Sequence, residues 1–178
     1  MKRLLFLAVC ALAAGTLATS CKLSELELDG TTWQVHRCED LFNGKVVNLF
    51  WEDEDEIVEI NGYGDNIQVT ITDPGSIYGP STYGPEDVRI ISCTASELVF
   101  DLFYAEYEDL DVDDCDYLLT YKGTKIYTHP YIYYGKEELM YVYFKPNGVA
   151  VDVGCYNYEG EDDIWWDSTR YHCKRVRL

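Results

Sequence analysis

The sequence predicts an all-β fold, either an antiparallel β-barrel or a β-sandwich, after a cleaved N-terminal signal helix. Short runs of alternating apolar and polar residues recur along the chain, and this period of two is typical of half-buried strands. Valine, isoleucine, threonine and tyrosine dominate these runs, and such residues suit a pleated surface. Many short strands at close spacing favour a closed barrel or a sandwich.

Three segments alternate most clearly, and they are residues 67–72, 98–104 and 149–153. In the second of them, the side chains of Leu98, Phe100, Leu102 and Tyr104 line one face. The other predicted strands are residues 31–38, 45–51, 57–60, 88–93, 117–121, 125–134, 139–144 and 164–173.

Turn residues separate the predicted strands. The hairpin signals, with the strongest first, are Pro146-Asn147-Gly148, Asn43-Gly44, Asn61-Gly62 and Lys122-Gly123. A longer loop is predicted from residue 73 to about residue 87. Its prolines cannot donate hydrogen bonds to a ladder, so we expect this stretch not to form a central strand.

The first 21 residues have the three parts of a secretory signal. Residues 1–3 include the basic pair Lys2 and Arg3, residues 4–14 form an apolar run too short to span a bilayer, and residues 15–20 are small or polar except for Leu17. With Cys21 at its end, the segment resembles a bacterial lipoprotein signal. The resemblance implies cleavage before Cys21 and lipidation of its thiol, and Lys22 then favours the outer membrane. The alternative is a plain signal peptide that is cut near residue 20.

The domain organisation follows from this signal. We expect residues 1–20 to be the signal peptide, residues 21–29 a tether and residues 30–178 a single all-β domain. A seam at residues 122–130 is the alternative, because the pattern restarts there with a tyrosine-rich hairpin. A single domain is favoured because neither half alone buries a large core.

The chain is strongly acidic, with 32 acidic residues against 14 lysines and arginines and a net charge of −18. Loss of the signal would remove two basic residues and no acidic ones. This charge argues against nucleic acid as a partner, because phosphate binding needs a basic face. It also disfavours anionic membrane surfaces, so we expect the lipid alone to hold the protein at a membrane.

The cysteines beyond Cys21 leave two interpretations open. An exported domain can keep disulfides, but an odd number of cysteines leaves at least one without an intramolecular partner. A bridge between Cys38 and Cys173 is one possibility, and burial of all the thiols is the other. The cysteines concerned are Cys38, Cys93, Cys115, Cys155 and Cys173.

The first half of the chain resembles the lipocalin-like lipoproteins of Gram-negative bacteria. The residues that carry the resemblance are Leu28 to Trp33, Val88 to Ser92 and Glu97 to Asp101. An extra threonine before Trp33 departs from the family pattern, and the half after Lys122 has no counterpart. The resemblance implies a β-barrel, sometimes with an apolar ligand inside. It also implies an arginine over the first-strand tryptophan, for which the candidates are Arg170, Arg175 and Arg177.

No motif predicts catalysis, a cofactor or a metal site. The spacing of Asp109, Asp111 and Asp113 imitates the start of a calcium loop, but the expected glycine and final glutamate are missing. His36 and Cys38 share a strand face, yet zinc would need four such ligands. The acidic runs at residues 52–56 and 159–163 are typical of solvated hairpin tips, with a site for a basic partner as the alternative.

Aromatic residues are the best candidates for a binding surface. The predicted binding residues are Tyr78 and Tyr83, in the loop that starts at residue 73, and Trp165 and Trp166, of which one ring should be exposed. We therefore expect a lipid-anchored, non-enzymatic module that binds a protein or a glycan. The alternatives are a lipocalin-like carrier of a small apolar ligand and a glycosidase with two facing carboxylates.

Overall fold

The computed structural model describes residues 28–50, 56–63, 66–75, 79–156, 158–160 and 162–176. These residues form strands and one short 3-10 helix at Val112–Asp114, and six of the strands close into a barrel, which confirms the predicted all-β fold. The signal segment and Cys21 lie outside the described residues. Within the described part of the chain, no helix has the length and apolar character needed to cross a membrane.

The strands are named in chain order. The first seven are β1 (Thr32–Phe42), β2 (Lys45–Phe50), β3 (Ile57–Tyr63), β4 (Asn66–Asp73), β5 (Ser81–Cys93), β6 (Glu97–Phe103) and β7 (Glu106–Tyr107). The others are β8 (Asp116–Tyr121), β9 (Thr124–Tyr133), β10 (Lys136–Phe144), β11 (Ala150–Asp152), β12 (Gly154–Tyr156), β13 (Ile164–Trp166) and β14 (Ser168–Arg175).

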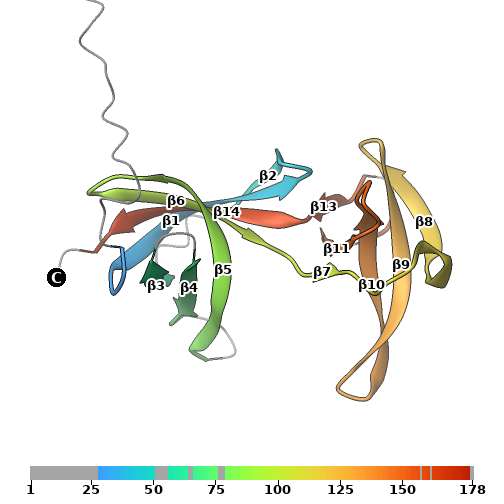
Figure 1. Cartoon of the computed structure of the whole chain (residues 1–178), viewed down its shortest axis with the longest axis horizontal. Coiled ribbons are helices and arrows are strands. Elements are labelled where there is room, and N and C mark those ends of the chain that lie inside the picture. The colour runs from blue at the N-terminus through green and yellow to red at the C-terminus, as the bar shows by residue number, and fades with distance from the viewer. Residues whose placement is uncertain are drawn as a thin grey trace, which may run out of the picture.

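Six antiparallel strands form the closed barrel (Figure 1). Their order is β14-β6-β5-β4-β3-β1, and pairing of β1 with β14 closes the ring. The first residues of β1 pair with β3, whereas its last residues, from Cys38 to Phe42, pair with β2. The strand β2 therefore extends the sheet beside the ring rather than completing it.

Apolar side chains fill the barrel interior. The side chains of Trp33, Ile60 and Phe100 are fully buried there, together with those of Val35, Val58, Val69 and Leu98. Leu28 is buried in the same core, before the turn in which Gly30 donates a hydrogen bond to the carbonyl of Ile60. Burial of this apolar area is the main force that holds the barrel together.

An arginine lies over the first-strand tryptophan. Arg175 pairs with Trp33 in the ladder, and its guanidinium carbon is 5.7 Å from the centre of the Trp33 ring. Of the other two candidates, Arg170 instead contacts Asp101, and Arg177 lies outside the described residues. The indole nitrogen of Trp33 donates to the Thr31 hydroxyl at 2.8 Å, so this buried polar group is satisfied.

A second sheet has the order β7-β11-β10-β9-β8, and β12 and β13 form a separate pair (Figure 1). A second apolar core lies here, and its buried members include Phe42, Ile126 and Trp165. The chain leaves the barrel after β6 and returns to it at β14. Residues 122–130, the alternative position for a seam, form the turn of the β8–β9 hairpin and most of β9. A single domain remains a prediction.

The loop expected to run to residue 87 is shorter than predicted. The strand β5 begins at Ser81 and pairs with both β4 and β6, so it is a central strand. Gly84 and Pro85 lie where the β4–β5 register shifts, and a bulge needs no regular ladder donor. Gly84 has a φ of +111°, and a Cβ there would lie 2.5 Å from the carbonyl oxygen of Val69. The local backbone therefore requires glycine.

Candidate functional site

A pocket of about 320 Å³ opens at one end of the barrel, and we call it the mouth pocket. Its polar lining consists of Glu56, Asp73, Ser81, Tyr83, Tyr104, Thr169 and Tyr171. Several strand ends meet here, because β4 and β6 end at this rim while β3, β5 and β14 begin at it. The lining therefore comes from segments far apart in the sequence.

The packed core forms the inner end of the mouth pocket. The rings of Tyr171 and Phe100 stack with their centres 5.0 Å apart, and Phe100 is fully buried. Burial raises the pKa of Tyr171, and the nearby Cys38 thiol and Glu56 carboxylate add to this shift. Tyr171 is thus a neutral phenol at physiological pH, with its ring between the core and the pocket.

Tyr104 is held in place by Trp166, the last residue of β13. The indole nitrogen of Trp166 donates to the Tyr104 hydroxyl at 2.5 Å, and the backbone nitrogen of Tyr104 donates to the carbonyl of Asp167. Burial raises the pKa of Tyr104, although the hydrogen bond from Trp166 opposes this shift. Because both its hydroxyl and its backbone nitrogen are hydrogen-bonded, the ring of Tyr104 is positioned before any ligand binds.

A second hollow of about 450 Å³ lies between the barrel and the second sheet, and we call it the groove. Tyr104 lines the groove as well as the mouth pocket, together with Asp101, Tyr143, Lys145 and Asp167. Lys145 forms an ion pair with Glu106 at this site. Tyr104 is therefore shared by the two hollows.

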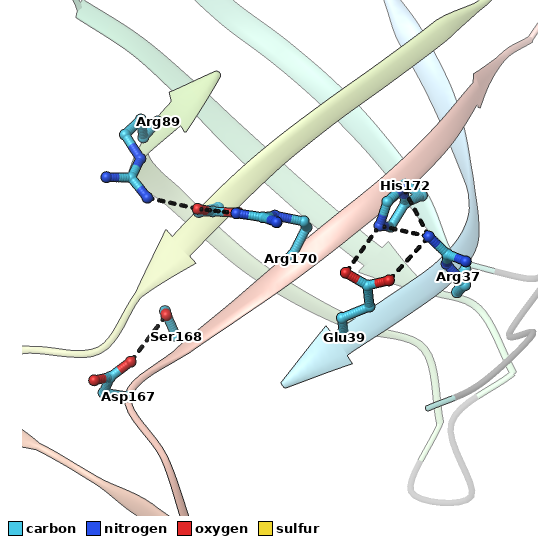
Figure 2. A network of polar contacts seen from close by, with 8 residues as sticks. Arg37, Glu39, Arg89, Asp167, Ser168, Arg170 and His172 are labelled. Carbon is cyan, nitrogen blue, oxygen red and sulfur yellow. Dashed lines mark hydrogen bonds and ion pairs between the residues drawn. The ribbon is translucent and has the colours of Figure 1, made fainter. Parts of the chain in front are cut away.

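A row of charged residues crosses the outer face of the barrel (Figure 2). Asp101 is fully buried between Arg170 and Arg89, which pair with it in the ladder from either side. Next along the row, the carboxylate oxygens of Glu39 lie 2.9 Å from a guanidinium nitrogen of Arg37 and 3.3 Å from Nε2 of His172. These arginines are therefore engaged by carboxylates rather than turned toward the mouth pocket.

The predicted binding residues have different positions. Tyr83 lines the mouth pocket and is 50% exposed, whereas Trp166 is half-buried and supports Tyr104. The expectation that one of the two rings is exposed is wrong, because Trp166 is only partly exposed and Trp165 is fully buried in the second core against Tyr141 and Tyr158. Tyr78 lies outside the described residues. Two of the four predicted residues therefore belong to one site.

Sequence reasoning missed most of the polar lining. The sequence nevertheless contains a signal for it. In each strand every second residue faces the barrel core, and the next residue in that alternation, at the strand end, lines the rim of the pocket. The alternation runs from Phe100 through Leu102 to Tyr104 in one case, and from Cys173 through Tyr171 to Thr169 in another. The residue that ends such an alternation lines the mouth of a barrel.

A further cluster of aromatic residues lies at the tip of the β9–β10 hairpin, which extends beyond the neighbouring strands (Figure 1). Tyr131, Ile132, Tyr133 and Tyr134 are exposed there, and Tyr134 is the most exposed at 89%. The rings of Tyr133 and Tyr134 are 4.6 Å apart. None of these residues lines the mouth pocket or the groove, so Tyr134 offers a control substitution away from both.

The acidic clusters form no metal site in the described residues. No group of three histidine, cysteine, aspartate or glutamate side chains there is arranged to hold an ion. Asp111 instead caps the 3-10 helix by accepting a hydrogen bond from the Asp113 backbone nitrogen at 3.1 Å. Asp163 likewise accepts bonds from the backbone nitrogens of Glu159 and Gly160.

The five cysteines beyond Cys21 are thiols in this structure. Cys38, Cys93 and Cys173 lie buried in the barrel core, whereas Cys115 and Cys155 are only partly buried, so the interpretation that all five thiols are buried holds for three of them. Cys38 pairs in the ladder with Tyr171, whereas Cys173 pairs with Val35. The two cysteines are therefore not directly opposite each other in the ladder.

Comparison of the chain with protein-family models, curated proteins and solved structures found no match. The site must therefore be interpreted from its own chemistry. Its described lining offers two carboxylates, three phenols and no lysine, arginine or histidine. Ile57 pairs with Thr72, and this register, continued by one residue, places Glu56 and Asp73 next to each other at the ends of β3 and β4. Such a lining is suited to binding.

Gly154 is expected to control the position of Trp166. A Cβ at this glycine would lie 2.6 Å and 2.7 Å from atoms of the Trp166 ring, so Gly154→Ala must displace the indole from Tyr104. We expect the free energy of unfolding to fall by about 1–3 kcal/mol, as in other overpacked sites. Urea unfolding followed by tryptophan fluorescence measures this loss. Gly160→Ala is the control, because nothing lies within 4 Å of its added Cβ, and equal stability of the two variants would contradict the prediction.

Proposed function

We propose that this chain is a lipid-anchored binding module of the bacterial cell envelope, tethered to the outer membrane through Cys21. Its ligand is part of a protein or a glycan, and it binds in the mouth pocket. The observation that carries this proposal is the mouth pocket itself, in which Tyr83, Tyr104 and Tyr171 surround a hollow at the end of a rigid barrel. Tyrosines that combine an apolar ring with a polar tip are typical of binding surfaces.

The alternative function is transport of a small apolar ligand inside a lipocalin-like barrel. The contact between Arg175 and Trp33 supports the resemblance to that group. A carrier of this kind needs an apolar cavity in the barrel, however, and the described interior is filled by side chains such as Trp33 and Phe100. We therefore place the ligand at the mouth, where the lining is polar and aromatic.

The binding proposal is tested with glycan and peptide arrays probed by the full-length protein in detergent. We expect binding to at least one class of ligand, and loss of most of this signal in Tyr104→Ala. Tyr134→Ala is the matched control, because it removes a fully exposed tyrosine from the hairpin tip. No signal above background, or a signal that Tyr104→Ala leaves unchanged, would overturn the proposal.

The lipid anchor is tested separately. Cys21→Ser removes the thiol to which a diacylglycerol would be attached, and the acidic body has little affinity for anionic membranes. We expect the variant to leave the membrane fraction and to appear as a water-soluble protein. Cell fractionation and immunoblotting measure this change, with Cys115→Ser as the control. A variant that stays with the membrane would show that Cys21 is not the anchor.

A further inference from the structure

The mouth pocket combines aromatic rings with negative charge. The rings of Tyr83, Tyr104 and Tyr171 line it, and the carboxylates of Glu56 and Asp73 lie next to each other at its rim. Aromatic faces carry partial negative charge and attract cations, and carboxylates accept hydrogen bonds from ammonium and guanidinium groups. Both the rings and the carboxylates therefore favour a ligand with a positive charge.

The surroundings of the pocket strengthen this preference. The described lining contains no basic side chain, and Arg37, Arg89 and Arg170 on the outer barrel face form ion pairs with Glu39 and Asp101. The carboxylate of Glu56 acts on the interior of the pocket, because it contributes to the raised pKa of Tyr171. The net charge of −18 adds a long-range negative potential that attracts cations.

The pocket also has a place for an aliphatic stem. Ile71 and Leu102 lie in the wall between the tyrosines and the barrel core. Long cationic groups place their methylenes against apolar surface while the charged end contacts polar groups. A hollow of about 320 Å³ is large enough for such a chain, although it is too small for a folded partner.

We infer that the mouth pocket binds an organic cation, namely a primary amine or guanidinium carried on an aliphatic chain, and this inference rests on the proposed binding function. The charged end lies between the Glu56 and Asp73 carboxylates and the faces of the tyrosine rings. Free polyamines and the lysine or arginine side chains of a peptide share this chemistry. A neutral sugar would satisfy the rings but not the charge.

The experiment is titration calorimetry on the full-length protein in detergent with spermidine, trilysine and maltotriose. We expect spermidine or trilysine to bind, more weakly as salt is added, and maltotriose not to bind. The double variant Glu56→Gln and Asp73→Asn should weaken cation binding by about tenfold or more. Asp109→Asn, which removes an exposed carboxylate from another loop, should leave it within about twofold. Tighter binding of trilysine would support a peptide ligand, whereas tighter binding of spermidine would support the cation inference but contradict a protein or glycan as the ligand.

The contrary results separate the two proposals. If maltotriose binds in a manner that Tyr104→Ala abolishes and neither cation binds, the cation inference fails while the binding function stands. If cations bind equally well to the double variant and to Asp109→Asn, the binding reflects overall charge, and the inference fails. If no probe or array ligand depends on Tyr104, both proposals fail.

Discussion

Replacement of Asp101 by alanine is expected to lower the free energy of unfolding by about 3–5 kcal/mol, the loss typical when one partner of a buried ion pair is removed. Its side chain is only 1% exposed, although it lies on the outer face of the barrel. Arg170 binds both carboxylate oxygens, at 2.6 Å and 3.0 Å, and Arg89 binds one of them at 2.7 Å. Alanine would leave two guanidinium groups without their carboxylate.

The two arginines are expected to contribute unequally. Arg170 is 25% exposed and makes a two-pronged contact, whereas Arg89 is 60% exposed and is screened by water. We therefore expect Arg170→Ala to cost about 2 kcal/mol or more and Arg89→Ala about 1 kcal/mol or less. Urea unfolding of the single and double variants measures the coupling energies. Equal losses for the two arginines would contradict this ranking.

The Asp101 cluster also predicts a dependence on pH. Burial alone would raise the pKa of Asp101, but hydrogen bonds from Arg170 and Arg89 hold it below the ordinary value of 3.8. The unfolded chain therefore binds this proton at a higher pH than the folded chain does. The stability from Asp101 is present above pH 3.8 and is lost as the pH falls through the folded pKa. In Asp101→Asn the acid-induced loss of stability should be smaller, as measured by urea unfolding at several pH values.

Much of the barrel could be predicted from local pattern, because burial of one face fixes the period of each strand. Residues 67–72 lie in β4 and residues 98–103 in β6, and every second side chain of these runs lies in the barrel core, as their alternation in the sequence predicts. The hairpin turn at Asn43-Gly44 likewise joins two observed strands. The strand β5 was missed in part because a bulge at Gly84 and Pro85 permits residues that a regular central ladder excludes.

The mouth pocket could be predicted only in part, because it depends on closure of the barrel. Tyr83 and Tyr171 are distant in the sequence, and only the ring of six strands brings them to one rim. The adjacent tryptophans show the same limit. Alternation predicts that Trp165 and Trp166 point in opposite directions, but only the position of the second sheet decides that Trp165 is the buried one. Contacts between distant segments therefore decide which residues line the pocket and which tryptophan is buried, and the local sequence pattern does not.

Replacement of Asp167 by alanine is expected to lower the free energy of unfolding by about 3 kcal/mol, because several buried donors lose their acceptor. Asp167 is 7% exposed and lies between β13 and β14, where the chain returns to the barrel. Its Oδ2 atom accepts hydrogen bonds from the Asn43 backbone nitrogen at 2.9 Å and the Tyr143 hydroxyl at 3.0 Å. Its Oδ1 atom accepts one from the Ser168 hydroxyl. The residue thus joins the β1–β2 turn, the second sheet and β14.

The substitution Asp167→Asn provides the matched control, because it keeps one oxygen that can accept both bonds now made to Oδ2. The new amide nitrogen would then face the Ser168 hydroxyl, which can accept as well as donate. We expect a loss of about 1 kcal/mol for Asp167→Asn and a similar loss for Tyr143→Phe. Urea unfolding measures these losses, and a ranking in which asparagine costs as much as alanine would contradict the assigned bonds.

Tyr143 supplies an independent readout of the same contact. Burial raises the pKa of Tyr143 above its ordinary value of 10.0, and the charge of Asp167 and the hydrogen bond to it raise the pKa further. The folded chain therefore keeps this proton at a higher pH than the unfolded chain, so stability falls as the pH rises above 10.0. Without the carboxylate the shift is smaller, and the alkaline loss of stability should be shallower in Asp167→Ala than in the parent protein. An unchanged alkaline profile would show that Asp167 does not act on Tyr143, even if the variant is destabilised.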